Sequence, residues 1–279
     1  PWLIMVAAIH TMITFKKSST ALKSSIVLVI ASFVLVLYAT FLVRSGVLGD
    51  SSVHSFTDLG LSGQLLIYML FFLFVAIFLA AKNWKHIPTS EKEASVYSRE
   101  FWIFIGATTL ALMAFQVILP TSIPVWNALV ESFGGISNLA PPADQIGFYT
   151  KFQLWFAVAV ALLTAVGQFF WWNKMDSKAL REALVTPYII SVVLSAIIII
   201  TGKVFDITYI IVVLAGTFTI VANATILIRL LKKSSFKLAG GSLAHIGLGM
   251  VLIGVMFSSG YSEVISYNMS GLTYSNSWE

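Results

Sequence analysis

Long apolar runs alternate with short polar stretches along the whole chain. Seven uncharged runs are long enough to cross a bilayer, since a spanning helix needs about 20 apolar residues. These runs are Ser25 to Val43, Leu59 to Ala81, Phe101 to Leu119, Phe152 to Asn173, Ala183 to Gly202, Ile207 to Ile228 and Leu238 to Ser262. A shorter apolar run covers Pro1 to Thr14. The pattern predicts an all-α fold, a polytopic membrane helix bundle with about seven full transmembrane helices and one partial N-terminal helix.

Composition agrees with this class. The chain is 58% hydrophobic and 10% charged, with a mean hydropathy of +0.91, which is outside the globular range. It has no cysteine, which excludes disulfides, thiolate metal sites and thiol chemistry carried by the chain itself. Because the sequence begins at Pro1 inside an apolar run and shows no signal peptide, we expect an internal fragment of a longer protein. Residues 1–279 are expected to form a single transmembrane domain.

Basic residues gather on one set of connections. That set holds 14 of the 17 basic residues, namely Lys16, Lys17, Lys23, Lys82, Lys85, Lys92, Arg99, Lys174, Lys178, Arg181, Arg229, Lys232, Lys233 and Lys237. The positive-inside rule places this set in the cytoplasm. The loops 45–58 and 121–150 and the tail 260–279 are then external. The bias accounts for the net charge of +5, so we expect a lipid bilayer and no nucleic acid as partner.

Two connections carry further expectations. The stretch Ala81 to Glu100 is charged with mixed signs, and we expect a solvated linker there. In the long external connection, Val125 to Phe133 is expected to form a short interfacial helix, with Trp126 at the level of the lipid headgroups.

Two histidines lie inside predicted spans. His10 is six residues before Lys16, and His245 is eight residues after Lys237. At a helical rise of ~1.5 Å per residue, they lie ~9 and ~12 Å from their cytoplasmic anchors. The two helices run in opposite directions across the bilayer, so both imidazoles are expected at a similar depth. Two such imidazoles could bind a haem iron from opposite faces.

Glycines flank His245 in the stretch GGSLAHIGLGMVLIG. Gly241 and Gly249 lie four residues before and four residues after His245, so they share its side of the helix. Such a stripe could seat a flat ring against the backbone. It could equally serve close helix packing, with Gly240 and Ala244 as a small-xxx-small pair. The spacing leaves both roles open, and it does not match a dinucleotide-binding fingerprint.

The other candidate residues lie outside the spans. His54 is in the external stretch RSGVLGDSSVHSF, where it is either a solvated residue or a ligand. His86 lies among cytoplasmic lysines and is expected to be solvated. Arg44 closes its span at the outer interface, where it could snorkel or pair with an anionic group such as a haem propionate.

Several stretches together resemble the CcmF family of haem-handling membrane proteins (CcmF/NrfE/CcsA). TFLVRSGVLGDSSVHSF, residues 40–56, is similar to the family signature TFLVRSGVL-x-SVHAF. PWLIMVAAIH resembles the segment that follows the family's tryptophan-rich loop. SRE at residues 98–100, ISNLAPP at residues 136–142 and the late histidine span also agree, in family order and over nearly the whole chain.

The resemblance implies a role for each histidine that matches. His10 and His245 match the two axial ligands of a resident b-type haem, which passes electrons, from quinol, to the substrate haem. His54 matches one of two external histidines that ligate the haem delivered by the chaperone CcmE. It would be the catalytic residue of a haem lyase that works with the CcmH partner. The family forms thioether bonds between haem vinyl groups and the CxxCH cysteines of apocytochrome c, on the periplasmic side of the bacterial inner membrane.

The chain departs from the family pattern at several points. Gly49-Asp50-Ser51 stands where one residue is usual, and Phe104 to Ala107 stands where many members have an Asn pair. The tryptophan-rich loop and the second external histidine are not found in this sequence. Three alternatives stay open: a non-catalytic haem-binding or assembly subunit, a paralogue dedicated to nitrite reductase, and, least favoured, a transporter. A transporter would be expected to carry buried carboxylates or paired broken spans.

Overall fold

The computed structural model describes residues 1–15, 20–49, 60–88, 94–170, 175–233 and 236–261. Its α-helices are α1 (Trp2–Phe15), α2 (Thr20–Arg44), α3 (Ser62–Asn83), α4 (Arg99–Thr121), α5 (Ile123–Ser132), α6 (Gln145–Gly167), α7 (Ser177–Thr201), α8 (Ile207–Lys232) and α9 (Ala239–Val255). Short turns of other helix types follow α3 at Trp84–His86, precede α9 at Phe236–Leu238 and follow α9 at Met256–Gly260.

The predicted fold class is confirmed. Seven of the helices in the described ranges are long and apolar enough to cross a membrane, and Trp2–Thr14 is a shorter apolar helix. They correspond to the seven predicted runs and to the N-terminal stub. The short helix expected near Trp126 is α5, which begins two residues earlier than predicted and has a proline in its first turn. The protein is an all-α polytopic membrane bundle.

Polar side chains set where several helices begin. The Ser98 hydroxyl accepts a hydrogen bond from the backbone N–H of Phe101, and Asp176 and Asp206 cap α7 and α8 in the same way. Such side chains satisfy backbone donors that have no partner within the helix. At α4 this start lies inside the protein, because Ser98 is 1% and Glu100 is 6% exposed. The prediction of a solvated linker is therefore wrong at its last residues.

Helix α6 is shifted from the predicted span Phe152 to Asn173. It begins at Gln145, where Asp144 caps the N–H of Gly147, and it ends at Gly167. The aromatic residues beyond its end leave the helix and pack inward. Phe169 and Phe170 are each 4% exposed, and the Phe170 ring stacks on Trp102. The apolar run is therefore longer than the helix, since Phe169 and Phe170 are buried beyond its end.

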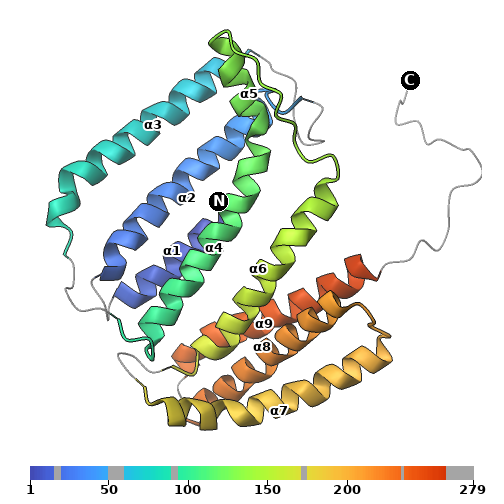
Figure 1. The fold of residues 1–279 in the computed structure, drawn as a ribbon. Helices are drawn as coiled ribbons and strands as arrows, with labels where there is room; N and C mark the ends of the chain where they lie inside the picture. Colours follow the sequence, from blue (N-terminus) through green and yellow to red (C-terminus); the bar gives the residue numbers. More distant parts are fainter. Residues whose placement is uncertain (16–19, 50–59, 89–93, 171–174, 234–235, 262–279) are drawn as a thin grey trace, which may run out of the picture.

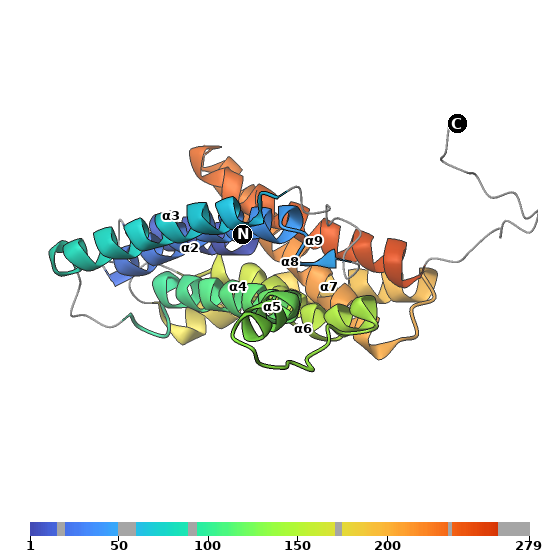
Figure 2. The same ribbon diagram turned by 90° about the horizontal axis from the view of Figure 1, so that it is seen from above.

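The chain reverses direction from one long helix to the next, so that successive long helices are roughly antiparallel (Figure 1). α1 packs on α2 and α4, and α2 packs on α3. α4 then packs on α6, α6 on α8 and α9, and α8 on α7 and α9. α4 and α6 thus lie between an N-terminal group, α1 to α3, and a C-terminal group, α7 to α9, and the views in Figures 1 and 2 agree with this order.

The predicted basic connections come together at one end of the bundle, which we call the basic end. Lys23 at the start of α2 lies over the ring of Trp84, just after α3. Arg229 near the end of α8 lies over Phe169, just after α6. The basic end is thus where α2, α4, α7 and α9 begin and where α3, α6 and α8 end.

Burial is uneven across the bundle. The centre of α8 is the most buried part, and Val213, Thr219, Ala222 and Asn223 are fully enclosed. Two of its polar groups bond to α6: Thr219 Oγ1 donates to the Ala161 carbonyl at 2.8 Å, and Asn223 Nδ2 donates to the Thr164 carbonyl at 3.2 Å. By contrast, α3 has no buried residue. The C-terminal group therefore contains the most buried part of the bundle.

Candidate functional site

The structure brings His10 and His245 together. Their ring centroids are 6.2 Å apart and their planes differ by 11°. Both side chains are half-buried. His10 comes from α1 and His245 from α9, although α1 packs on α2 and α4 whereas α9 packs on α8 and α6. The similar depth predicted from the sequence is thus realised as a direct pairing of the two imidazoles.

Nδ1 of His10 forms a hydrogen bond within its own helix. Nδ1 lies 2.8 Å from the carbonyl oxygen of Val6, one turn earlier. A carbonyl only accepts, so Nδ1 donates and its proton is fixed there. The neutral ring then presents an unprotonated Nε2. Metal-binding histidines use this arrangement, in which one nitrogen donates to a carbonyl and the other ligates.

Nδ1 of His245 has a partner at the end of another helix. Nδ1 lies 3.2 Å from Nε2 of Gln168, the residue directly after α6. Gln168 is itself engaged, because Nη2 of Arg99 donates to its Oε1. Arg99 is the first residue of α4. In both histidines Nδ1 therefore has a partner, so a ligand would bind through Nε2; at His245 the amide N–H donates to Nδ1, which leaves the proton of the neutral ring on Nε2.

The separation of the two rings fits a metal held between them. Two imidazoles that each bound one shared metal ion through a bond of about 2 Å, with roughly 1 Å from nitrogen to ring centroid, would have centroids about 6 Å apart. Among the described residues, no group of three or more His, Cys, Asp or Glu side chains could hold a metal ion. A bare zinc ion usually takes four protein ligands. A haem iron already has four porphyrin nitrogens and needs two axial ligands, which suits a lone histidine pair.

The two predicted glycines differ in their surroundings. Gly249 is buried, and a Cβ there would lie 2.9 Å from the Gly216 carbonyl oxygen and 2.7 Å from Cγ1 of Ile220, both on α8. A Cβ on Gly241 would meet only Nε2 of Gln168, at 3.4 Å. Of the two roles that the sequence left open, Gly249 therefore has helix packing, whereas Gly241 faces the partner of His245.

Arg44 and His86 do not join the histidine pair. Arg44 is the last residue of α2, and its side chain is exposed. His86 is exposed in the short turn after α3, as expected for a solvated residue. His54 and the inserted Asp50 and Ser51 lie outside the described residues. The structure therefore places the inner pair and leaves the outer histidine a prediction.

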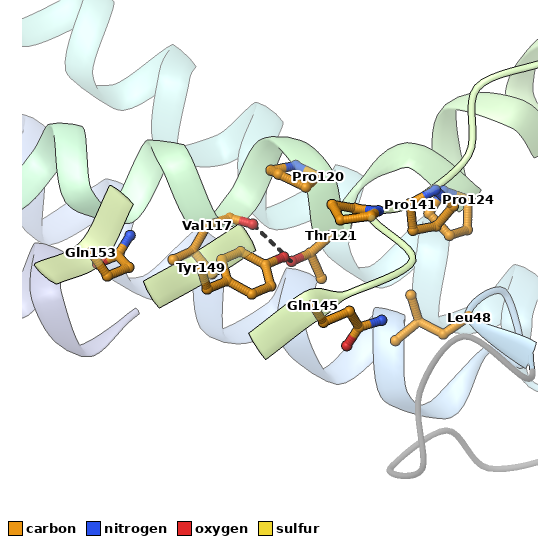
Figure 3. Close-up of a pocket in the computed structure, with 10 residues that line it drawn as sticks. Leu48, Val117, Pro120, Thr121, Pro124, Pro141, Gln145, Tyr149 and Gln153 are labelled. Atoms are coloured by element: carbon orange, nitrogen blue, oxygen red, sulfur yellow. Dashed lines mark hydrogen bonds between the residues drawn. The ribbon is translucent and has the colours of Figure 1, made fainter. Parts of the chain in front are cut away.

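A cleft lies at the other end of α4 from Arg99 (Figure 3). It has a volume of about 300 Å³, and its lining includes Leu48, Pro120, Pro124, Pro141 and Tyr149. The hydroxyls of Tyr149 and Thr121 are 3.1 Å apart and share a hydrogen bond. Leu48 belongs to the RSGVLGDSSVHSF stretch and Pro141 to ISNLAPP. Two of the family-like segments thus border one mostly apolar cleft.

Sequence reasoning missed Gln168 and Arg99. Gln168 was counted among the apolar residues of a span, and Arg99 was assigned to a solvated linker. A usable signal was present, because a lone amide in a long apolar run must find a polar partner inside the protein. Nothing in the sequence showed that this partner would be a histidine 77 residues later.

The structure defines a polytopic membrane bundle that pairs two histidines from separate helices. Comparison with known proteins gives the family. The chain is 28% identical over 267 residues to the cytochrome c-type biogenesis protein CcmF of Escherichia coli, a match that covers 94% of this chain and 40% of the relative. It is homologous to the CcmF-type cytochrome c biogenesis proteins.

Two further relatives carry other names. The cytochrome c-type biogenesis protein ccl1 of Rhodobacter capsulatus is 31% identical over 205 residues, 71% of this chain and 29% of the relative. CycK of Bradyrhizobium diazoefficiens is 27% identical over 274 residues, 92% of this chain and 40% of the relative. The chain spans about two fifths of the length of most of the curated relatives it matches. No protein-family model and no solved structure matches it.

Proposed function

We propose that this chain is the haem-handling part of a cytochrome c haem lyase, and that His10 and His245 are the axial ligands of a resident b-type haem. The observation that carries this proposal is the pair itself: near-parallel rings 6.2 Å apart, each with Nδ1 already occupied. The names of the relatives support the setting, since they are cytochrome c-type biogenesis proteins.

The side chains at the pair have distinct tasks. His10 and His245 would hold the iron through Nε2, and the Val6 carbonyl keeps the His10 ring in one orientation. The half-buried position limits access of water to the site. Haem bound there supplies one-electron transfer, which keeps the substrate haem reduced. A quinol in the bilayer is the proposed electron donor.

The outer side of the protein is the proposed place of haem attachment. The basic end then faces the cytoplasm, as the positive-inside rule requires for a bacterial inner-membrane protein. The cleft beside Leu48 and the loop that carries His54 face the periplasm. His54 would hold the iron of the incoming haem, and Arg44 at the end of α2 would contact a propionate.

The attachment reaction needs no cysteine from this chain, which has none. A thiol of the apocytochrome adds across a haem vinyl group: sulfur bonds to one vinyl carbon, and the proton goes to the other. No net oxidation or reduction occurs in this addition. The proposed partners are the haem chaperone CcmE, a CcmH-type protein and the apocytochrome c.

Replacing the pair tests the inner site. We expect His10→Ala and His245→Ala each to abolish the b-type absorption spectrum of the protein purified from membranes, since one axial ligand is lost. His86→Ala is the matched control, because His86 is exposed in the short turn after α3. A wild-type spectrum in both His10→Ala and His245→Ala would rule out this assignment.

Replacing His54 tests the outer site. We expect His54→Ala to keep the b-type spectrum and to block covalent attachment in a strain that lacks its own lyase. The assay measures cytochrome c by its haem stain after denaturing electrophoresis. Full attachment by His54→Ala would refute the proposed role of this residue. A wild-type protein that binds haem but attaches none would favour the assembly subunit.

A further inference from the structure

Three polar groups from three separate helix ends form a chain at the basic end. Arg99 begins α4, Gln168 follows α6 and His245 lies in the second turn of α9. Arg99 Nη2 donates to Gln168 Oε1, and Gln168 Nε2 lies 3.2 Å from Nδ1 of His245. Arg99 and Gln168 are both half-buried. A hydrogen-bonded chain of this kind fixes each member through the next.

The side chain of Gln168 lies against Gly241 of α9. Gly241, one turn before His245, has no side chain and lets the amide approach the backbone of α9. Phe169, the next residue, is buried against the core formed by Ala165 and Ala222. The backbone at Gln168 is therefore anchored, and its amide lies between Arg99 and His245.

We propose that Gln168 is the positioning residue of His245 and that Arg99 holds Gln168 in place. This inference rests on the proposed binding of haem by the histidine pair. The amide contact defines the direction of the imidazole plane, which the helix backbone alone does not fix. His10 has the equivalent contact from the Val6 carbonyl in its own helix, whereas His245 takes it from α6.

The hydrogen bond from Gln168 determines which nitrogen of a neutral His245 carries the proton. With the amide as the structure has it, Gln168 donates to Nδ1, so the proton of a neutral His245 is on Nε2. A histidine that ligates iron through Nε2 carries its proton on Nδ1 and needs an acceptor there. The oxygen of the same amide is that acceptor. For His245 to bind iron through Nε2, the Gln168 amide would turn so that its oxygen accepts from Nδ1–H. The Arg99 guanidinium would then have to follow that oxygen, because the amide nitrogen would otherwise face it as donor against donor.

The expected size of the effect follows from other metal sites. Loss of an outer partner of a metal-bound histidine typically costs 10–100-fold in metal affinity. An acceptor on Nδ1–H makes the imidazole a stronger donor to the metal, which favours the oxidised iron. Removing the acceptor should therefore raise the reduction potential of the haem, and strengthening it should lower the potential.

Two substitutions of Gln168 separate positioning from packing. Gln168→Leu removes both polar atoms, and we expect haem affinity to fall about 10–100-fold and the midpoint potential to rise. Gln168→Glu keeps the shape, pairs with Arg99 and presents only acceptors, so the potential should fall below that of the wild type. The midpoint potential is measured by titration of the b-type absorption band, and affinity by haem titration of the purified protein.

Gln153→Leu is the matched control. Gln153 is on α6 itself and makes the same kind of contact, since its Nε2 donates to the Met113 carbonyl at 3.2 Å and to Gln116 Oε1. It lies about 22 Å from Gln168 along the helix direction. We expect it to leave the potential unchanged, even where it lowers thermal stability.

The outcomes separate this inference from the proposed function. Opposite shifts of the potential in Gln168→Leu and Gln168→Glu, with none in Gln153→Leu, support it. An unchanged potential and affinity in Gln168→Leu would overturn it, as would shifts of the same sign in both Gln168 variants. A wild-type protein without a b-type spectrum would instead refute the proposed function.

Discussion

The two halves of α9 have the same small residues and opposite surroundings. In the outer half, Gly249 is pressed against Gly216 and Ile220 of α8, and a Cβ there would overlap both. In the inner half, Gly241 and His245 face Gln168, with His10 beyond the imidazole. One half of the helix is thus a packing surface, and the other half is the wall of a polar site.

Helix geometry explains why the two glycines separate. Each residue turns about 100° around the helix axis, so residues four before and four after His245 lie ~40° to either side of it. Gly241 and Gly249 are therefore ~80° apart, which is enough to face different neighbours. A stripe of small residues can serve a cofactor at one end and a helix contact at the other.

The largest expected effect is at the packing half. Gly249→Ala places a Cβ within 2.9 Å of the Gly216 carbonyl oxygen, so α8 and α9 must move apart. Overpacking of this kind costs about 1–3 kcal/mol. We expect a clear drop in the thermal unfolding midpoint of the protein in detergent, with a smaller effect on the b-type spectrum.

Gly247→Ala is the control for this change. Gly247 is on the same helix, and a Cβ there meets nothing within 4 Å. Since alanine is a better helix former by up to about 1 kcal/mol, this variant should be as stable as the wild type or more so. Equal midpoints for Gly249→Ala and Gly247→Ala would mean that the outer half of α9 is not a close-packed surface.

A smaller effect is expected in the half of α9 that contains Gly241 and His245, and it concerns the midpoint potential rather than stability. Gly241→Leu directs a side chain toward Gln168 Nε2 from an exposed helix position. Surface changes usually alter stability by no more than about 0.5 kcal/mol. We expect unfolding close to that of the wild type, and a rise in the haem midpoint potential as the amide is pushed from His245.

Gly240→Leu is the control here, because Gly240 is the adjacent residue and a Cβ on it meets nothing within 4 Å. It should change neither property. A stability loss in Gly241→Leu as large as that of Gly249→Ala would show that both halves of α9 are packing surfaces.

The sequence was sufficient to predict most of the fold. Bilayer-length apolar runs require helices, because every backbone polar group in lipid must bond within its own segment. The ends were less certain. Phe169 and Phe170 extended an apolar run beyond α6 because burial in protein and exposure to lipid select the same residue types. Glu100 shows the reverse case, a charged residue that the structure buries at the start of α4.

Of the site, the sequence predicted only the depth of the two histidines in the bilayer. Distance from basic anchors gave His10 and His245 the same level, but rotation about a helix axis is set by neighbouring helices, which a single sequence does not reveal. For that reason Gly249 could not be assigned to packing, and the contact of Gln168 with His245 could not be foreseen. These features depend on α6 and α8, which lie far from α9 in sequence.

The smallest expected effect concerns the end of α8 opposite the basic end. Backbone N–H groups of Tyr209 and Thr208 hydrogen-bond to the Asp206 carboxylate and lower its pKa from the ordinary value of 3.8. A carboxyl whose pKa is lower in the folded protein stabilises the fold above its unfolded pKa, and this contribution is lost as pH falls through the folded pKa. We expect a slight extra loss of thermal stability below about pH 4.

Asp206→Asn isolates this contribution, because an amide oxygen still accepts from the helix N-terminus while the charge is absent. The wild type should unfold at a slightly higher temperature than Asp206→Asn at pH 6, and the difference should shrink toward pH 3. The b-type spectrum should be the same in both proteins at pH 6, since Asp206 lies at the far end of α8 from the histidine pair. A changed spectrum would mean that the N-terminal end of α8 and the histidine pair are coupled, and that the division of α9 into two independent halves is wrong.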